Sequence, residues 1–133
     1  MRIVTLLVVV VSAVALAASA GSAGLAATVK VSLVEFKVLP SPAKATHGAV
    51  RFVATNKGGL DHQFVVLKTN LPPAKLPVKS SKAVEVGKVA SIRVVKPGKS
   101  VTLTLTLKAG KYVLLCNVPG HYQAGQRAAF TVS

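Results

Sequence analysis

Hydrophobic and polar residues alternate along most of the chain after residue 27, with the period of two that is typical of half-buried β-strands. The segment 100–107 (SVTLTLTL) is the clearest case, since valine and leucine occupy one face and threonine occupies the other. Alternation or a short apolar run predicts further strands at 28–36, 49–56, 62–67, 111–116 and 126–132. The segment 62–67 is apolar on both faces, which indicates a central strand.

Proline and glycine separate these segments at Pro40-Ser-Pro42, Lys57-Gly-Gly59, Lys96-Pro-Gly98 and Ala109-Gly110. Segment 70–88 is rich in proline and lysine and cannot be a central strand, so it predicts a long surface connection with room for a short helix or edge strand. No helical period is long enough to bury a face. The fold class is therefore all-β, a Greek-key β-sandwich of seven to eight strands.

Residues 1–27 have the pattern of an export signal. Arg2 supplies a positive start, 3–18 are apolar, and small residues allow cleavage after 20, 23 or 27. An uncleaved membrane anchor is the alternative, although the run is short for a transmembrane helix. The sequence thus predicts a single exported domain at 28–133 that is periplasmic, at the cell surface or extracellular.

The chain is strongly basic, with 17 Lys and Arg, 3 acidic residues and a net charge of +14. Removal of Arg2 with the signal leaves 16 basic residues against 3 acids, or +13. Nucleic-acid binding is not expected, because there is no dense basic helix and aromatic residues make up only 5% of the chain. The charge instead favours long-range attraction to an acidic partner or to anionic lipid.

Cys116 is the only cysteine, so it is buried and inert, paired with another chain, or bound to a metal. Strand phase places Cys116 on one face with Tyr112 and Leu114, at the end of its strand. His62 begins another inward-facing strand, and antiparallel neighbours would bring the two residues to one rim. His121 follows five residues after Cys116, across a Val-Pro-Gly turn. One cysteine and two histidines with a weak axial ligand form the blue-copper electron-transfer site.

The segments NKGGLDHQFVVL, KPGKSVTLTLTLKAGKYVLLC and CNVPGHYQAG resemble the cupredoxins, the plastocyanin and azurin family of small blue copper proteins. The resemblance covers nearly all of 28–133 and implies one type 1 copper per chain, bound by His62, Cys116 and His121. The family usually has an axial methionine, but the only methionine here is Met1. Gln126 occupies the axial position, as in stellacyanin-like members, and its amide oxygen implies a lowered reduction potential.

The resulting functional prediction is a small exported blue copper protein, a monomer and not an enzyme, that carries single electrons between redox partners. Its partner would be acidic at the docking face and would meet the apolar surface around His121. A copper-binding or copper-delivery protein without an electron-carrier role is the alternative, and a zinc-bound or metal-free interaction module is a third reading. Copper enzymes need further histidines, and only His47, which we expect not to be a ligand, is spare.

Overall fold

A computed structural model of the chain describes residues 24–133. The predicted signal segment lies almost entirely outside these residues and stays a prediction. Strand β1 (Ala27–Val34) begins at Ala27, which pairs with Val50, so cleavage after 27 would remove the first residue of this strand. Residues 24–133 contain no helical segment with the length and hydrophobicity that spanning a bilayer requires.

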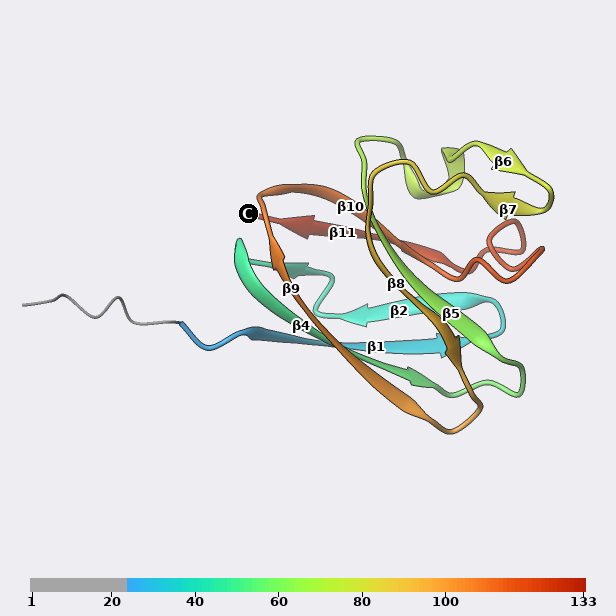
Figure 1. Ribbon diagram of the computed structural model, residues 1–133, viewed down its shortest axis with the longest axis horizontal. Helices are drawn as coiled ribbons and strands as arrows, with labels where there is room; N and C mark the ends of the chain where they lie inside the picture. The colour runs from blue at the N-terminus through green and yellow to red at the C-terminus, as the bar shows by residue number, and fades with distance from the viewer. Residues whose placement is uncertain (1–23) are drawn as a thin grey trace, which may run out of the picture.

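The described residues form two mixed sheets and a short hairpin (Figure 1). The first sheet has the order β2 (Lys37–Ser41), β1, β4 (Gly48–Asn56) and β9 (Ser100–Leu107). The second has the order β3 (Lys44–Ala45), β11 (Arg127–Val132), β10 (Gly110–Leu115), β5 (His62–Lys68) and β8 (Lys88–Val95). Strands β6 (Val78–Lys79) and β7 (Lys82–Ala83) pair with each other, and η1 (Pro73–Lys75) is a single 3₁₀ turn. Of these strands, eight have five residues or more, which confirms the predicted all-β class and strand number.

The chain crosses between the two sheets at β2–β3, β3–β4, β4–β5, β8–β9 and β9–β10, which is the connectivity expected of a Greek-key sandwich. Alternate residues of the facing strands form the core between the sheets. Its largest members are Phe52, Phe64 and Phe130. The centroid of the Phe52 ring lies 5.6 Å from that of Phe64 and 5.3 Å from that of Phe130. The inward positions are those that the period-two pattern predicts.

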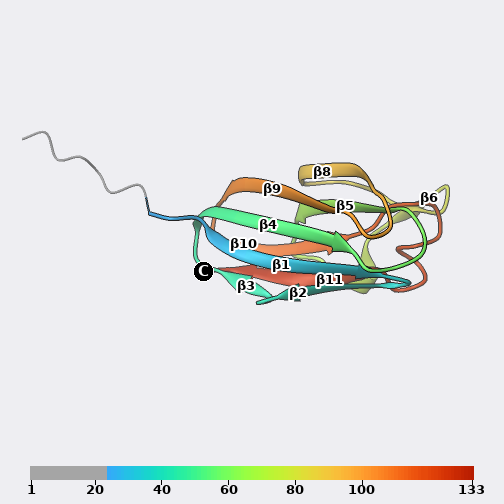
Figure 2. The same ribbon diagram turned by 90° about the horizontal axis from the view of Figure 1, so that it is seen from below.

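A second buried cluster lies on the outer face of the second sheet. Val65 and Leu67 of β5 and Val113 and Leu115 of β10 contact side chains from outside the sheet, namely Leu76, Ala83 and Tyr122. The connection 69–88 supplies Leu76 and Ala83, and this cover explains why β5 is apolar on both faces. The β6–β7 hairpin and the loop after β10 lie at the same end of the molecule in both ribbon views (Figures 1 and 2).

Candidate metal centre

The structure brings the three predicted residues His62, Cys116 and His121 together at one rim of the sandwich. Their ligand atoms all lie within 4.8 Å of one another, and all three side chains are buried. The Sγ atom of Cys116 is 3.7 Å from Nδ1 of His62 and 3.5 Å from Nδ1 of His121. Gln126 joins the group, since its Oε1 atom lies 3.1 Å from Nδ1 of His121.

Strand pairing and a tight loop produce this convergence. Strands β5 and β10 are antiparallel neighbours with Val65 opposite Leu115, so the start of β5 and the end of β10 meet at the same rim. After Cys116 the chain turns back within ten residues, because the Cys116 N–H donates to the carbonyl of Gln126 at 3.0 Å. The N–H of Gln126 in turn donates to the carbonyl of His121 at 3.1 Å. The backbone itself therefore fixes the spacing of three of the four predicted ligands.

The Cys116 sulfur is held in an environment with two opposing effects. Burial raises the pKa of the thiol, whereas the N–H groups of Gln63 and Val118 lower it by stabilising the thiolate. The Gln63 N–H lies 3.2 Å from Sγ. A bound cation would favour the thiolate further, since coordinating thiols are deprotonated.

His62 is fixed in one tautomer by Glu35. The Nε2 atom of His62 lies 3.0 Å from Oε1 of Glu35, and the same oxygen accepts the Leu60 N–H at 2.8 Å. The Leu60 hydrogen bond lowers the pKa of Glu35, so the group is a carboxylate at neutral pH and can only accept. Burial lowers the pKa of His62, although Glu35 opposes this shift, so the ring is neutral. Its proton is therefore on Nε2, and the lone pair on Nδ1 faces Cys116.

The Gln126 side chain is oriented by a hydrogen bond as well. Its Nε2 atom donates to the carbonyl of Val34 at 3.0 Å, which directs Oε1 towards His121 and the centre. Gln126 is fully buried. Nδ1 of His121 can donate a proton to this oxygen across 3.1 Å, or both atoms can face a cation as electron-pair donors. Gln126 therefore adds an oxygen donor beside the sulfur and the two imidazole nitrogens.

The end of β1 and the turn that follows it contact three of the four predicted ligands, and no spacing in the sequence predicts these contacts. Val34 holds Gln126, Glu35 holds His62, and the Phe36 ring meets the His121 ring edge to face at 5.0 Å. Glu35 is one of only three acidic residues in a very basic chain, and that scarcity is the one signal that could have drawn attention to it.

Asn56 both opens a turn and ties two segments together by hydrogen bonds. It opens the turn at 57–59, with its Oδ1 accepting the Gly58 N–H at 2.9 Å. Its Nδ2 donates to the carbonyls of Leu60 at 2.7 Å and Val95 at 2.8 Å, which ties the segment leading to His62 to strand β8. These bonds do not reach the loop after Cys116, so Asn56 supports only one side of the centre.

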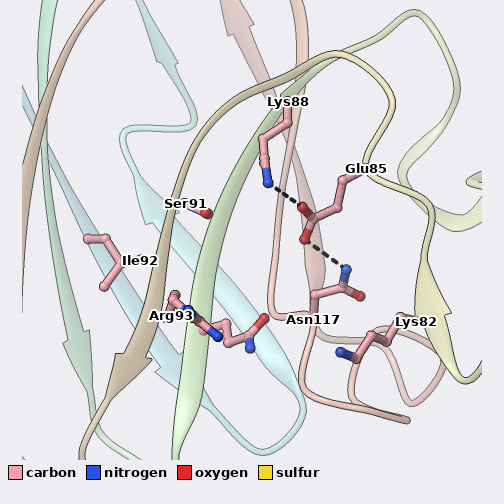
Figure 3. A pocket seen from close by; sticks show the side chains of 8 residues that line it. Lys82, Glu85, Lys88, Ser91, Ile92, Arg93 and Asn117 are labelled. Carbon is pink, nitrogen blue, oxygen red and sulfur yellow. Dashed lines mark hydrogen bonds and ion pairs between the residues drawn. The ribbon is translucent and has the colours of Figure 1, made fainter.

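Asn117 and Tyr122 fasten the ligand loop to the connection 69–88. Asn117 exchanges two hydrogen bonds of 2.9 Å with the backbone of Ala83 and donates to Glu85 at 3.0 Å. Figure 3 shows Glu85 between Asn117 and Lys88, whose ammonium group lies 2.8 Å from the carboxylate. The Tyr122 hydroxyl donates to the carbonyl of Pro73 at 2.6 Å and accepts the Leu76 N–H at 3.0 Å. Tyr122 thus fastens the ligand loop through its hydroxyl as well as through the packing of its ring.

His47 lies outside this group. It precedes β4, at the opposite end of that strand from Asn56, and its Nδ1 lies 2.9 Å from the carbonyl of Ser133. Among the described residues, the only cluster of three His, Cys, Asp or Glu side chains with metal-ligand spacing is the one formed by His62, Cys116 and His121. This donor set fits copper, because thiolate favours Cu(I) and imidazole accepts both oxidation states.

Comparison with known proteins gives a short sequence match and a broad structural one. No protein-family model matches the chain. It is 54% identical over 39 residues to the copper-resistant cuproprotein CopI of Pseudomonas aeruginosa. That match covers 29% of this chain and only 22% of the relative, so the two proteins are alike over a limited segment.

Solved cupredoxin structures match most of the described chain. Rusticyanin from Thiobacillus ferrooxidans has a TM-score of 0.64 at 22% identity, covering 83% of this chain and 79% of that one. Auracyanin from the photosynthetic bacterium Roseiflexus castenholzii has a TM-score of 0.59 at 22% identity, covering 83% and 99%. A rusticyanin variant with a methionine replaced by glutamine has a TM-score of 0.63 at 22% identity, covering 83% and 79%. Rusticyanin is a copper protein.

These likenesses define the class of the fold. The chain is a β-sandwich with the cupredoxin fold, as the sequence resemblance implied. A cluster of two histidines and one cysteine with metal-ligand spacing lies at one rim of this sandwich.

Proposed function

We propose that this chain is an exported, monomeric blue copper protein that carries single electrons, with copper bound by His62, Cys116 and His121 and with Gln126 as axial ligand. The observation that carries the proposal is the convergence of one Sγ, two Nδ1 atoms and one Oε1 atom at a buried rim. A site of this composition is the blue-copper electron-transfer site. Copper, when bound, supplies the one-electron couple between Cu(II) and Cu(I).

The residues around the donor atoms keep them in place during oxidation and reduction. Each of the four side chains has at least one partner that fixes it: Gln63 for the thiolate, Glu35 for His62, Phe36 for His121 and Val34 for Gln126. Little rearrangement is then needed when the charge at the centre changes. A rigid, dry site of this kind supports fast electron transfer and excludes bulk water.

Gln126 gives the site a low reduction potential in this proposal. An amide oxygen is a harder donor than the thioether usual in the family, and it stabilises the more highly charged oxidation state. The Val34 carbonyl keeps that oxygen, rather than the amide nitrogen, directed towards the centre.

Electrons would enter and leave beside His121. His62, Cys116 and Gln126 are 0% exposed, whereas His121 is 9% exposed and lies against the half-exposed ring of Phe36. The net positive charge of +13 after signal removal would attract a partner that is acidic around its docking face. The rate of electron exchange with such a partner should fall as salt is raised, since the Debye length shrinks to about 10 Å at 0.1 M.

The test is the visible spectrum of the copper-loaded protein. Oxidised wild type should show intense thiolate-to-copper absorption that ascorbate or dithionite bleaches, and Cys116→Ser should remain folded but lack this band. A colourless copper complex, or preferential retention of zinc, would refute the electron-carrier proposal. Mass spectrometry of the exported protein would identify its mature N-terminus and thereby test the signal segment.

A copper-binding or copper-delivery role is the second candidate, and the local likeness to the copper-resistant cuproprotein CopI favours it. The two roles differ in whether the reduced protein gives up its copper ion or an electron. A delivery protein gives its metal to a competing Cu(I) chelator faster than it passes an electron to an inorganic oxidant, whereas an electron carrier shows the reverse order. Stopped-flow measurement of both rates on one preparation separates them.

A further inference from the structure

Glu35 lies where its carboxylate can control His62. It occupies the turn between β1 and β2, and its side chain is 29% exposed while His62 is fully buried. One oxygen, Oε1, receives both the Leu60 N–H at 2.8 Å and the Nε2–H of His62 at 3.0 Å. The carboxylate is thus held by the backbone on one side and holds the imidazole on the other.

The neighbouring glycine leaves room for this arrangement. A Cβ atom at Gly58 would lie 2.6 Å from Cδ of Glu35 and closer still to both carboxylate oxygens. The carboxylate therefore rests against the 57–60 backbone only because residue 58 has no side chain. Gly58 does not require the left-handed region, so alanine there would displace the flexible end of Glu35 rather than strain the backbone.

Resting on the function proposed above, we infer that Glu35 is a positioning residue for the metal centre. It keeps the proton of His62 on Nε2 and the lone pair on Nδ1, and it places a negative charge one imidazole ring away from the bound ion. Carboxylates that hold the distal nitrogen of a ligating histidine orient the ring and increase its basicity. The same charge stabilises Cu(II) relative to Cu(I), so Glu35 lowers the reduction potential together with Gln126.

Three variants separate the orientation of the His62 ring from the effect of the negative charge beside it. Glu35→Ala removes both the acceptor oxygen and the charge. Glu35→Gln keeps an acceptor oxygen but removes the charge, and Gly58→Ala keeps the charge but moves the carboxylate away from His62. Asp61→Asn is the matched control. Asp61 directly precedes His62, yet its carboxylate pairs with Lys96 at 2.6 Å and has no hydrogen bond to the imidazole.

The first measurement uses the metal-free protein and the nitrogen chemical shifts of its imidazole groups. Wild type, Glu35→Gln and Asp61→Asn should show His62 as the Nε2–H tautomer. Glu35→Ala and Gly58→Ala should show a mixture of tautomers. A single Nε2–H tautomer in Glu35→Ala would overturn the inference.

The second measurement is the affinity for Zn²⁺ and Co²⁺, which requires no redox activity. Glu35→Ala and Gly58→Ala should each lose about 10- to 100-fold in affinity, as is usual for such partners of metal ligands. Glu35→Gln should lose less, and Asp61→Asn should change by less than about twofold. Equal losses in Asp61→Asn and Glu35→Gln would show a general charge effect and refute a specific role for Glu35.

The third measurement is the reduction potential of the copper-loaded proteins. Glu35→Gln should have a higher potential than wild type and Asp61→Asn should change the potential less, whereas an unchanged potential in Glu35→Gln would contradict the charge role. A failure of the electron-carrier proposal can be distinguished from a failure of the role inferred for Glu35. A colourless copper protein whose tautomers and Zn²⁺ affinity respond to Glu35→Ala would retain Glu35 as a positioning residue and reject only the redox function.

Discussion

Replacing Asn117 by alanine should detach the connection 69–88 from the ligand loop. Asn117 is 3% exposed and makes three hydrogen bonds, two with the Ala83 backbone and one with the Glu85 carboxylate. A neutral hydrogen bond contributes about 0.5–1.5 kcal/mol and a bond to a charged group about 1.5–3 kcal/mol. Because Glu85 is partly exposed, the lower part of these ranges applies. Loss of the three bonds together should lower the free energy of unfolding by about 3 kcal/mol. That is a large fraction of the stability of a small domain.

Urea unfolding of the metal-free protein measures this loss, and native-state hydrogen exchange shows where it falls. Exchange should accelerate most at the Ala83 N–H, which loses its acceptor, and at the Gly120 N–H, which donates to the Ser81 carbonyl at 2.8 Å. Thr55→Val is the control, because it removes only an exposed hydroxyl bond to Ser100 and should change the free energy of unfolding by less than about 0.5 kcal/mol. A loss below about 1 kcal/mol in Asn117→Ala, with exchange at Ala83 unchanged, would refute the reasoning.

Three further predictions concern the reduction potential, the dependence of stability on pH, and stabilisation by bound Zn²⁺. Gln126→Met should raise the reduction potential clearly, and an unchanged potential measured by redox titration would remove Gln126 from the copper ligands. Burial alone would raise the pKa of Glu85, but its hydrogen bonds to Lys88 and Asn117 lower it overall. The difference in unfolding free energy between wild type and Glu85→Gln should therefore be constant above about pH 5 and shrink as pH falls below 4.5 through the lowered folded pKa. Zn²⁺ at 1,000 times its Kd should stabilise wild type by about 4 kcal/mol in urea unfolding and Cys116→Ser by much less at the same concentration.

The ligand cluster was predictable because β-strands carry positional information at long range. An inward cysteine at the end of one strand and an inward histidine at the start of another meet whenever the strands are antiparallel neighbours. The pairing of β5 with β10 meets that condition. His121 and Gln126 then follow from a short loop, whose length alone keeps them near Cys116.

The two-residue strands β3, β6 and β7 were not predicted, and among the longer strands β2 and β8 were not predicted as separate elements. The failures at β2 and β8 have physical reasons. β8 is an edge strand with an irregular pairing to β5, and most of its residues are exposed, so its sequence lacks clean alternation. β2 carries Pro40 and follows β1 after only two residues, so β1 and β2 were interpreted as one strand followed by a turn. The short turn between them holds Glu35, and no sequence spacing relates Glu35 to His62. Contacts of that kind depend on the registration of whole strands and are seen only in three dimensions.

All three acidic residues of this basic chain lie close to the candidate metal centre. Glu35 contacts His62, Asp61 precedes it, and Glu85 holds the residue after Cys116. The long-range electrostatic field is set by many exposed lysines, whereas the local electrostatic field at the metal is set by the Glu35 carboxylate one imidazole ring away.

The salt dependence of electron exchange and the reduction potential should therefore be separable. Neutralising an exposed lysine, as in Lys57→Gln, should reduce the salt dependence of electron exchange with an acidic partner and leave the potential unchanged. Glu35→Gln should raise the potential and leave the salt dependence nearly unchanged. Stopped-flow rates at several ionic strengths, with redox titrations of the same proteins, test both halves, and a variant that moves both properties together would contradict the separation.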